Sequence, residues 1–185
     1  PCGDTEIYWI ESHEAVRAVQ ERGLEQVLGV VKQVHGEQIA STFDTELIVP
    51  EVPFPRIALE EAKGRLREAG QDAPGPEHDL DPPSERALSA IVKERHGHEF
   101  AFVTDYPTSV RPFYHMRYPE RPTVTKSYDL LWRGIWLTPA AQPQPRHPSL
   151  PAQAHEREGA TAPSPHAVGL LPCTPHTPSL LRSRP

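Results

Sequence analysis

The prolines of this chain are distributed so unevenly that they limit which residues can form a folded core. The last 47 residues, Pro139 to Pro185, contain 11 of the 23 prolines and no aromatic residue, lysine or aspartate. A segment of this composition cannot bury enough apolar surface to offset the conformational entropy that it would lose on folding. The sequence therefore predicts a disordered tail over 139–185 and one folded part over 1–138.

Apolar periodicity, together with the positions of proline and glycine, predicts the elements of the folded part. In chain order we expect a strand at Glu6–Ile10, a helix at His13–Val34, an extended segment at Pro50–Pro55, helices at Leu59–Ala69 and from Ser84 to Gly97, and strands at Glu99–Thr104 and Lys126–Trp132. Long loops rather than crossover helices separate the later strands, so we predict an α+β fold with a mainly antiparallel sheet flanked by helices.

The segment from Phe100 to Gly134 contains eight aromatic residues and the only methionine of the chain. This composition is typical of a buried strand that leads into a pocket. Asp105, at the expected strand end, could orient an ammonium group or simply cap a turn. Arg111 could hold a carboxylate or phosphate through two hydrogen bonds, or form a buried structural pair with Asp105.

Three further residues of this segment are candidates for lining a pocket. His115 could act as a general acid or base, or be a partly buried hydrogen-bonding histidine. Strand alternation over Lys126–Asp129 places Ser127 and Asp129 on one face, which could line a pocket or be a solvated sheet surface. The candidate substrate-pocket residues are thus Asp105, Arg111, His115, Ser127 and Asp129.

Charge, cysteine content and motif searches exclude several classes of function. The net charge of −6 gives no basic footprint for nucleic acid. Two cysteines near opposite ends indicate neither a disulfide framework nor a zinc site, and no other metal site is expected. Phosphate-binding loops of the P-loop or Rossmann kind are not found. No apolar run long enough to cross a membrane occurs, so we expect a cytoplasmic protein.

Several sequence stretches resemble one enzyme family. FVTDYPTSVRPFYHM followed by TKSYDLLWRG is similar to the archaeal-type aspartyl-tRNA synthetases, which are class II aminoacyl-tRNA synthetases of the aspartyl, asparaginyl and lysyl subclass. EIYWIESHEAV and VPEVPFPRIALEEAKGRL agree with the family in the same order, so the resemblance covers about Glu6 to Thr138. Asparaginyl relatives share this layout but more often differ at Asp105 and Arg111, which favours the aspartyl branch.

The resemblance implies a partial class II catalytic domain over 1–138. The family is homodimeric, activates aspartate with ATP and Mg²⁺, and transfers it to tRNA. Its first and second signature motifs would lie before Pro1. After Gly134, Trp136 stands where the family has the glutamate that binds Mg²⁺ and ATP, Pro139 where it has Ser or Thr, and Pro143 where it has the aspartate-binding arginine.

These replacements argue against catalysis by this chain, so no catalytic residue is assigned and binding of ATP and Mg²⁺ is not expected. The abrupt change after Gly134 is typical of a shifted reading frame or a decayed gene, which would make 139–185 out-of-frame sequence. Two alternatives to an inactive fragment of an aspartate–tRNA ligase are a non-catalytic synthetase-like binding protein and an asparaginyl-tRNA synthetase relative.

Overall fold

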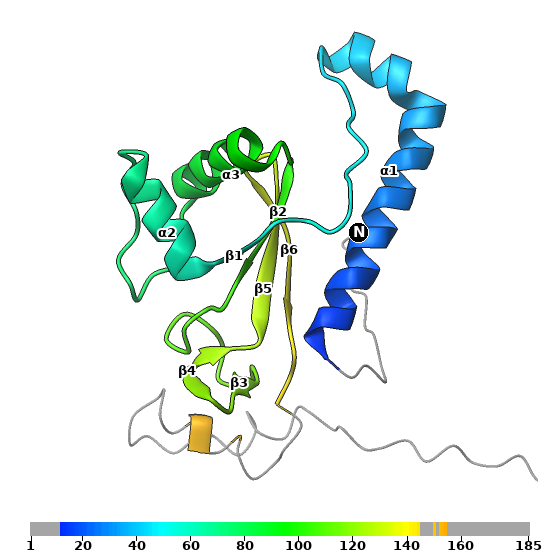
Figure 1. The fold of residues 1–185 in the computed structure, drawn as a ribbon. Helices are drawn as coiled ribbons and strands as arrows, with labels where there is room; N and C mark the ends of the chain where they lie inside the picture. The colour runs from blue at the N-terminus through cyan, green and yellow to red at the C-terminus, as the bar shows by residue number, and fades with distance from the viewer. Residues whose placement is uncertain (1–11, 145–149, 151, 155–185) are drawn as a thin grey trace, which may run out of the picture.

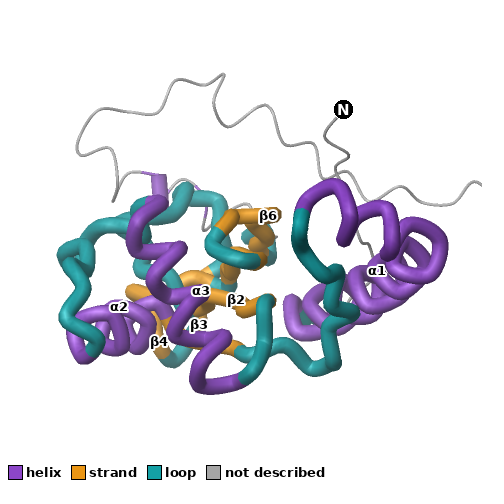
Figure 2. Tube along the Cα trace, turned by 90° about the horizontal axis from the view of Figure 1, so that it is seen from above, coloured by secondary structure: helices purple, strands orange, loops and turns teal. Residues whose placement is uncertain are grey.

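A four-stranded sheet forms the centre of the computed structural model, which describes residues 12–144, 150 and 152–154 (Figure 1). The elements are α1 (His13–Phe43), β1 (Arg56–Ala58), α2 (Leu59–Glu68), α3 (Pro82–His96), β2 (Phe100–Thr104), β3 (Arg117–Tyr118), β4 (Arg121–Thr125), β5 (Ser127–Trp132) and β6 (Ile135–Ala141). The strand order is β1-β2-β5-β6, and β3 and β4 form a separate hairpin. Helices α2 and α3 cover one face of the sheet and α1 lies on the other (Figures 1 and 2).

The sheet is antiparallel except at one edge. β1 pairs with β2 in parallel, whereas β2–β5 and β5–β6 are antiparallel. The register places Phe102 opposite Leu130 and Val103 opposite Asp129. Because side chains alternate along a strand, Asp129 projects from the face opposite to that of Tyr128 and Leu130.

The core under α2 and α3 is held by well-formed helix ends. The Asp81 carboxylate accepts a hydrogen bond from the Ser84 amide at 2.9 Å, and Pro82 stands at the first helical position of α3. Gly97 ends the helix at a φ of 64°, a left-handed conformation that favours glycine. The buried side chains of this cluster include Ile57, Leu66, Leu88, Val92, Val103 and Leu131.

The opposite face of the sheet packs against the first half of α1. The buried aromatic side chains of Phe54, Phe100, Phe102 and Tyr128 contact Val16, Leu24 and Leu28 of the helix. Two hydrogen bonds also fix the position of α1. The Tyr128 hydroxyl donates to the Gln20 side chain at 2.9 Å, and the Phe54 amide donates to the buried Glu21 carboxylate at 3.0 Å. This α1 surface is therefore held by specific hydrogen bonds as well as by apolar contact.

Two expected boundaries differ from the structure. Helix α1 continues nine residues beyond the expected end at Val34, to Phe43. The apolar pattern that predicted this end does not follow a buried face, because Val27, Val30 and Val34 are exposed. β6 continues to Ala141, so ordered structure crosses the expected boundary at 138. Backbone pairing with β5 stabilises this strand despite Pro139, which an edge strand tolerates. The expected strand at Glu6–Ile10 lies outside the described residues.

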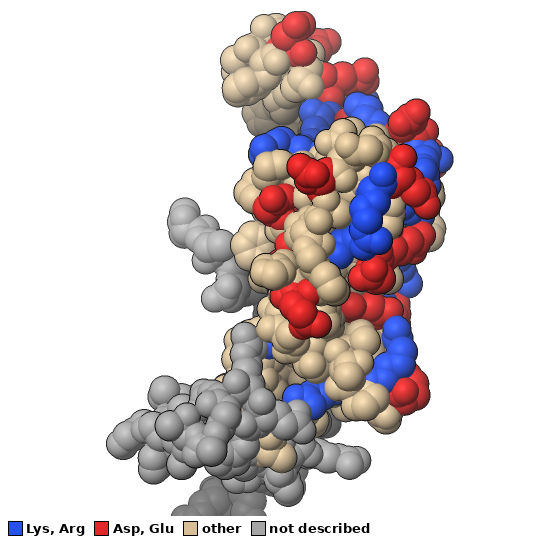
Figure 3. Space-filling model, turned by 90° about the vertical axis from the view of Figure 1, so that its left-hand side faces the viewer, with Lys and Arg blue, Asp and Glu red and all other residues tan. Residues whose placement is uncertain are grey.

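The surface over α2 and α3 carries no large area of one charge sign. Figure 3 shows lysine and arginine side chains interspersed with aspartate and glutamate over this face. None of the described helices has the length and apolar character needed to cross a bilayer.

Candidate functional site

A buried arginine in the loop after β2, paired with a carboxylate of β5, is the centre of the candidate site. Arg111 Nη2 donates to Asp129 Oδ2 at 2.5 Å, and both side chains are about nine-tenths buried. The guanidinium also lies 3.6 Å from the centre of the Tyr106 ring. Strand β5 therefore supplies the anion and the loop after β2 supplies both the cation and its aromatic support.

Asp105 does not pair with Arg111. It adopts a φ of 59° directly after β2, and its Oδ2 accepts from Arg121 Nη1 at 3.0 Å. With this left-handed backbone conformation, the Asp105 carboxylate lies beside the β3–β4 hairpin, to which Arg121 belongs. Of the two interpretations of Arg111, the structural pair with Asp105 is therefore wrong, and each of these two residues forms an ion pair with another partner.

Ser127 belongs to a short chain of hydroxyl groups at the start of β5. Its Oγ lies 2.8 Å from Thr125 Oγ1, which also donates to the Tyr106 carbonyl at 2.9 Å. Ser127 and Asp129 lie on one face of β5, as the alternation predicted, with Tyr128 on the other. Both side chains are buried rather than part of a solvated surface.

His115 lies against a very small cavity. This cavity measures about 10 Å³ and is lined by Thr108, Pro112, Phe113, His115, Arg117, Thr125 and Gln153. Such a volume holds no more than a single water molecule. The backbone around His115 is tied to the segment after β6, because the Met116 amide donates to the Gln142 carbonyl and the Gln144 amide to the Tyr114 carbonyl, both at 2.8 Å.

The surroundings of the Arg111–Asp129 pair carry an excess of carboxylates. Burial raises the pKa of Asp79, although the Leu80 amide and the Arg111 charge lower it. Burial and the negative charges of Asp79 and Asp129 also raise the pKa of Glu85. Burial, with Asp129 and Asp79 nearby, raises the pKa of the Tyr106 hydroxyl, which stays protonated.

Sequence reasoning missed three contributors to this site. Tyr106 supports the arginine, Asp79 adds negative charge from the loop before α3, and Thr125 links Ser127 to the β2 end. Tyr106 and Thr125 stand in the aromatic segment that marked the site. Asp79 lies in the loop between α2 and α3, and no local feature of the sequence indicates that it lies near Arg111.

The three positions at which the family has the Mg²⁺- and ATP-binding glutamate, the Ser or Thr and the aspartate-binding arginine carry side chains that cannot take these roles. Trp136 lies opposite Leu131 on β6 with 48% of its surface exposed, and Pro139 lies opposite Asp129. Pro143 forms an isolated bridge with His115. Mg²⁺ requires oxygen ligands, which none of these side chains offers. Among the described residues no group of three His, Cys, Asp or Glu side chains could hold a metal ion.

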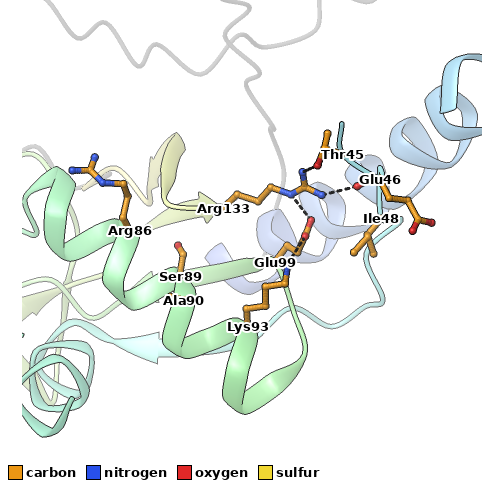
Figure 4. Close-up of a pocket in the computed structure, with 9 residues that line it drawn as sticks. All are labelled: Thr45, Glu46, Ile48, Arg86, Ser89, Ala90, Lys93, Glu99 and Arg133. Atoms are coloured by element: carbon orange, nitrogen blue, oxygen red, sulfur yellow. Dashed lines mark hydrogen bonds and ion pairs between the residues drawn. The ribbon is translucent and has the colours of Figure 1, made fainter. Parts of the chain in front are cut away.

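A larger cavity of about 440 Å³ lies elsewhere, between α3, the segment after α1 and the β5–β6 turn (Figure 4). Arg133 closes one side of it by donating to Glu99 at 2.6 Å, to Thr45 at 3.2 Å and to the Glu46 carbonyl at 2.8 Å. Lys93 also contacts Glu99 at 3.2 Å. Glu99 thus pairs with both Arg133 and Lys93, and Arg133 ties the segment after α1 to the β5–β6 turn, so we interpret the cluster as a structural junction.

Comparison with known proteins agrees with the sequence resemblance. An aspartate–tRNA(Asp) ligase of Pyrococcus abyssi is 35% identical over 154 residues, covering 83% of this chain and 35% of the relative. An aspartate–tRNA(Asp/Asn) ligase of Thermus thermophilus is 37% identical over 139 residues, covering 75% of this chain and 32% of the relative. The chain therefore spans about a third of the length of these curated relatives.

Solved structures show the same fold. The aspartyl-tRNA synthetase from Entamoeba histolytica matches with a TM-score of 0.72 and 24% identity, over 80% of this chain and 31% of that one. The asparaginyl-tRNA synthetase of the same organism gives 0.69 and 22%, over 78% and 34%. A family model described as tRNA synthetases class II (D, K and N) matches residues 3–156. The chain belongs to this family of class II tRNA synthetases.

Proposed function

We propose that this chain corresponds to part of the catalytic domain of an aspartate–tRNA ligase and that it does not itself activate aspartate. In the complete enzyme the reaction would join aspartate to ATP with Mg²⁺, and then transfer the aminoacyl group to tRNA. We also propose a cytoplasmic location and a homodimeric parent. The names of the relatives support the aspartyl assignment.

The observation that carries the proposal is the buried Arg111–Asp129 pair supported by Tyr106. An arginine held in this way is preorganised to meet a carboxylate, and the neighbouring acidic groups favour an ammonium. We assign Asp105, Arg111, His115, Ser127 and Asp129 to the wall of an amino-acid pocket. Asp105 and Ser127 act on this wall through Arg121 and Thr125, their hydrogen-bonding partners.

The proposed lack of activity rests on chemical groups that adenylate formation needs and that three positions on and after β6 do not supply. Adenylate formation needs cations that neutralise the triphosphate while the amino acid attacks the α-phosphate. Trp136, Pro139 and Pro143 provide neither a metal ligand nor a cation at their positions on and after β6. A non-catalytic synthetase-like binding protein is the second candidate, and Trp136 favours it because a tryptophan side chain offers no oxygen ligand for Mg²⁺.

ATP–pyrophosphate exchange tests the proposal directly. The full chain is assayed with L-aspartate and separately with L-asparagine, beside an active aspartate–tRNA ligase as positive control. We expect no exchange above the background without protein. Exchange with aspartate would overturn the assignment as inactive, and exchange with asparagine alone would move the chain to the asparaginyl branch. Sequencing the locus around codon 136 then shows whether another frame encodes the missing Glu, Ser or Thr, and Arg.

A further inference from the structure

The cavity of about 440 Å³ has one side, formed by α3, that the Arg133 junction leaves open. On this side α3 presents Arg86, Ser89 and Lys93, at spacings of three and four residues that place them on one face of the helix. Figure 4 shows them along α3, with Lys93 beside Glu99. Arg86 and Lys93 are exposed and Ser89 is half-buried, so this row of polar side chains is accessible to a ligand in solution.

Most hydrogen-bond donors on this side of the cavity are not used by the fold. Arg86 and Ser89 form no hydrogen bond or ion pair within the described part of the chain. The Lys93 ammonium has three N–H groups and makes one hydrogen bond, to Glu99 at 3.2 Å. Arg133 gives three of its five N–H groups to the junction. A ligand can therefore receive several hydrogen bonds here while the junction stays intact.

The cavity carries more positive than negative charge. Two cations of α3 and the arginine of the junction line it together with two carboxylates. The Glu46 carboxylate pairs with Lys32 at 3.0 Å, and the Glu99 carboxylate is shared by Arg133 and Lys93. In a chain whose net charge is −6, a local excess of positive charge favours an anionic ligand at this place.

The size and the remaining lining of the cavity fit a small organic molecule. A volume of about 440 Å³ lies in the range of small-molecule sites, and Ile48 and Ala90 add apolar side chains to the wall. A phosphate group carries close to two negative charges at neutral pH and has three acceptor oxygens. It can therefore accept from an arginine, a serine and a lysine together, whereas a carboxylate has only two oxygens for the same donors.

We propose that this cavity binds the phosphate group of a small organic molecule, with Arg86, Ser89 and Lys93 as the phosphate donors and Ile48 and Ala90 beneath the apolar part of the ligand. The proposal uses none of the residues assigned to the amino-acid pocket, so it is independent of the proposed function. Because the two α3 cations are exposed, salt should weaken the binding.

Titration of the full chain with phenyl phosphate, followed by the amide NMR signals of α3 at low ionic strength, tests whether the site exists. We expect saturable shifts centred on Ser89, and affinity at least fivefold lower in Arg86→Gln and in Lys93→Gln. Arg95→Gln is the matched control, because Arg95 stands on the same helix, pairs with Glu68 and does not line the cavity. Its affinity should lie within twofold of the wild type.

Three outcomes would overturn the site. They are the lack of any saturable shift up to about 10 mM phenyl phosphate, unchanged affinity in both cavity variants, and a loss in Arg95→Gln equal to theirs, which would indicate general attraction by the helix. The amide spectrum of each variant shows in the same experiment that the protein is folded, so weaker binding is not confused with unfolding.

Two further ligands test the ligand class. Inorganic phosphate lacks the apolar part and should bind at least threefold more weakly than phenyl phosphate, because no ring then covers Ile48 and Ala90. Phthalate is an aromatic dianion with carboxylates in place of the phosphate, and we expect it to bind at least tenfold more weakly. Equal affinity for phthalate would overturn the phosphate assignment, and equal affinity for inorganic phosphate would overturn the role of the apolar wall.

Discussion

Arg111 and Asp129 stand 18 residues apart in the chain and form a buried ion pair, with 2.5 Å between Nη2 and Oδ2. The pair joins the loop after β2 to the middle of β5, beneath α2 and α3. Because the Arg111 guanidinium also packs on the Tyr106 ring, its position is fixed on two sides. The same pair therefore stabilises the fold and orients the group to which we assign ligand binding.

Asp129→Ala should be among the most destabilising substitutions in the chain. It removes the buried carboxylate that pairs with Arg111, and breaking a buried ion pair in this way costs about 3–5 kcal/mol. Urea denaturation at neutral pH measures the loss. Arg121→Ala is the matched control, because the Arg121–Asp105 pair is partly exposed and should contribute about 1 kcal/mol or less. Equal losses for the two variants would contradict this account.

Local signals allowed much of the fold to be predicted from the sequence. Gly97 predicted the end of α3, and apolar runs predicted β2 and β5, whereas α3 begins at Pro82 rather than at the expected Ser84. The partner of Arg111 could not be predicted, because it depends on the register of β5 and on the left-handed backbone at Asp105. Composition predicts that disorder begins at Pro139, but backbone pairing with β5 continues the ordered strand β6 to Ala141.

Gly134→Ala should destabilise the β5–β6 turn. Gly134 has a φ of 78°, and a Cβ built there would lie 2.8 Å from the Arg86 Cα. The left-handed conformation costs an alanine about 1–2 kcal/mol, and the clash with backbone adds about 1–3 kcal/mol. Thermal denaturation should show a lower midpoint. Gly29→Ala in α1 is the control, because nothing lies within 4 Å and alanine should stabilise the helix by about 0.5–1 kcal/mol.

Lys63→Met should loosen the loop between α2 and α3. The buried Lys63 ammonium donates to the carbonyls of Gly75, Pro76 and His78 at 2.8, 3.2 and 2.6 Å. Methionine fills a similar volume but leaves these carbonyls without their donor, at a cost of about 2–4 kcal/mol. Hydrogen exchange over 71–81 should rise together with the loss of stability.

Lys32→Met is the control for this substitution, because Lys32 pairs with exposed Glu46 at the surface. Its effect on the free energy of unfolding should stay below about 1 kcal/mol. If Lys63→Met were as mild as this control, the three carbonyl contacts would not hold the loop.

Glu99 should make the stability of the chain depend on acid pH. Burial raises the pKa of its carboxyl, but hydrogen bonds from Arg133 and Lys93 outweigh burial, so the pKa in the folded state lies below the ordinary value. A carboxyl with a depressed pKa stabilises the fold when it is ionised. This contribution is complete at neutral pH and is lost as the pH falls below about 4, through the lower folded-state pKa.

Glu99→Gln tests this dependence because it keeps the shape of the side chain and removes its charge. We expect the variant to be about 1–3 kcal/mol less stable than the wild type at pH 7, since hydrogen bonds to a charged acceptor contribute more. The difference should shrink as the pH falls through the depressed folded-state pKa of Glu99, because both proteins then carry an uncharged group. Urea denaturation of the two proteins at intervals from pH 7 to pH 3 measures this difference in stability. A difference that stayed constant over this range would show that the Glu99 charge does not stabilise the junction between the β5–β6 turn, α3 and the segment after α1.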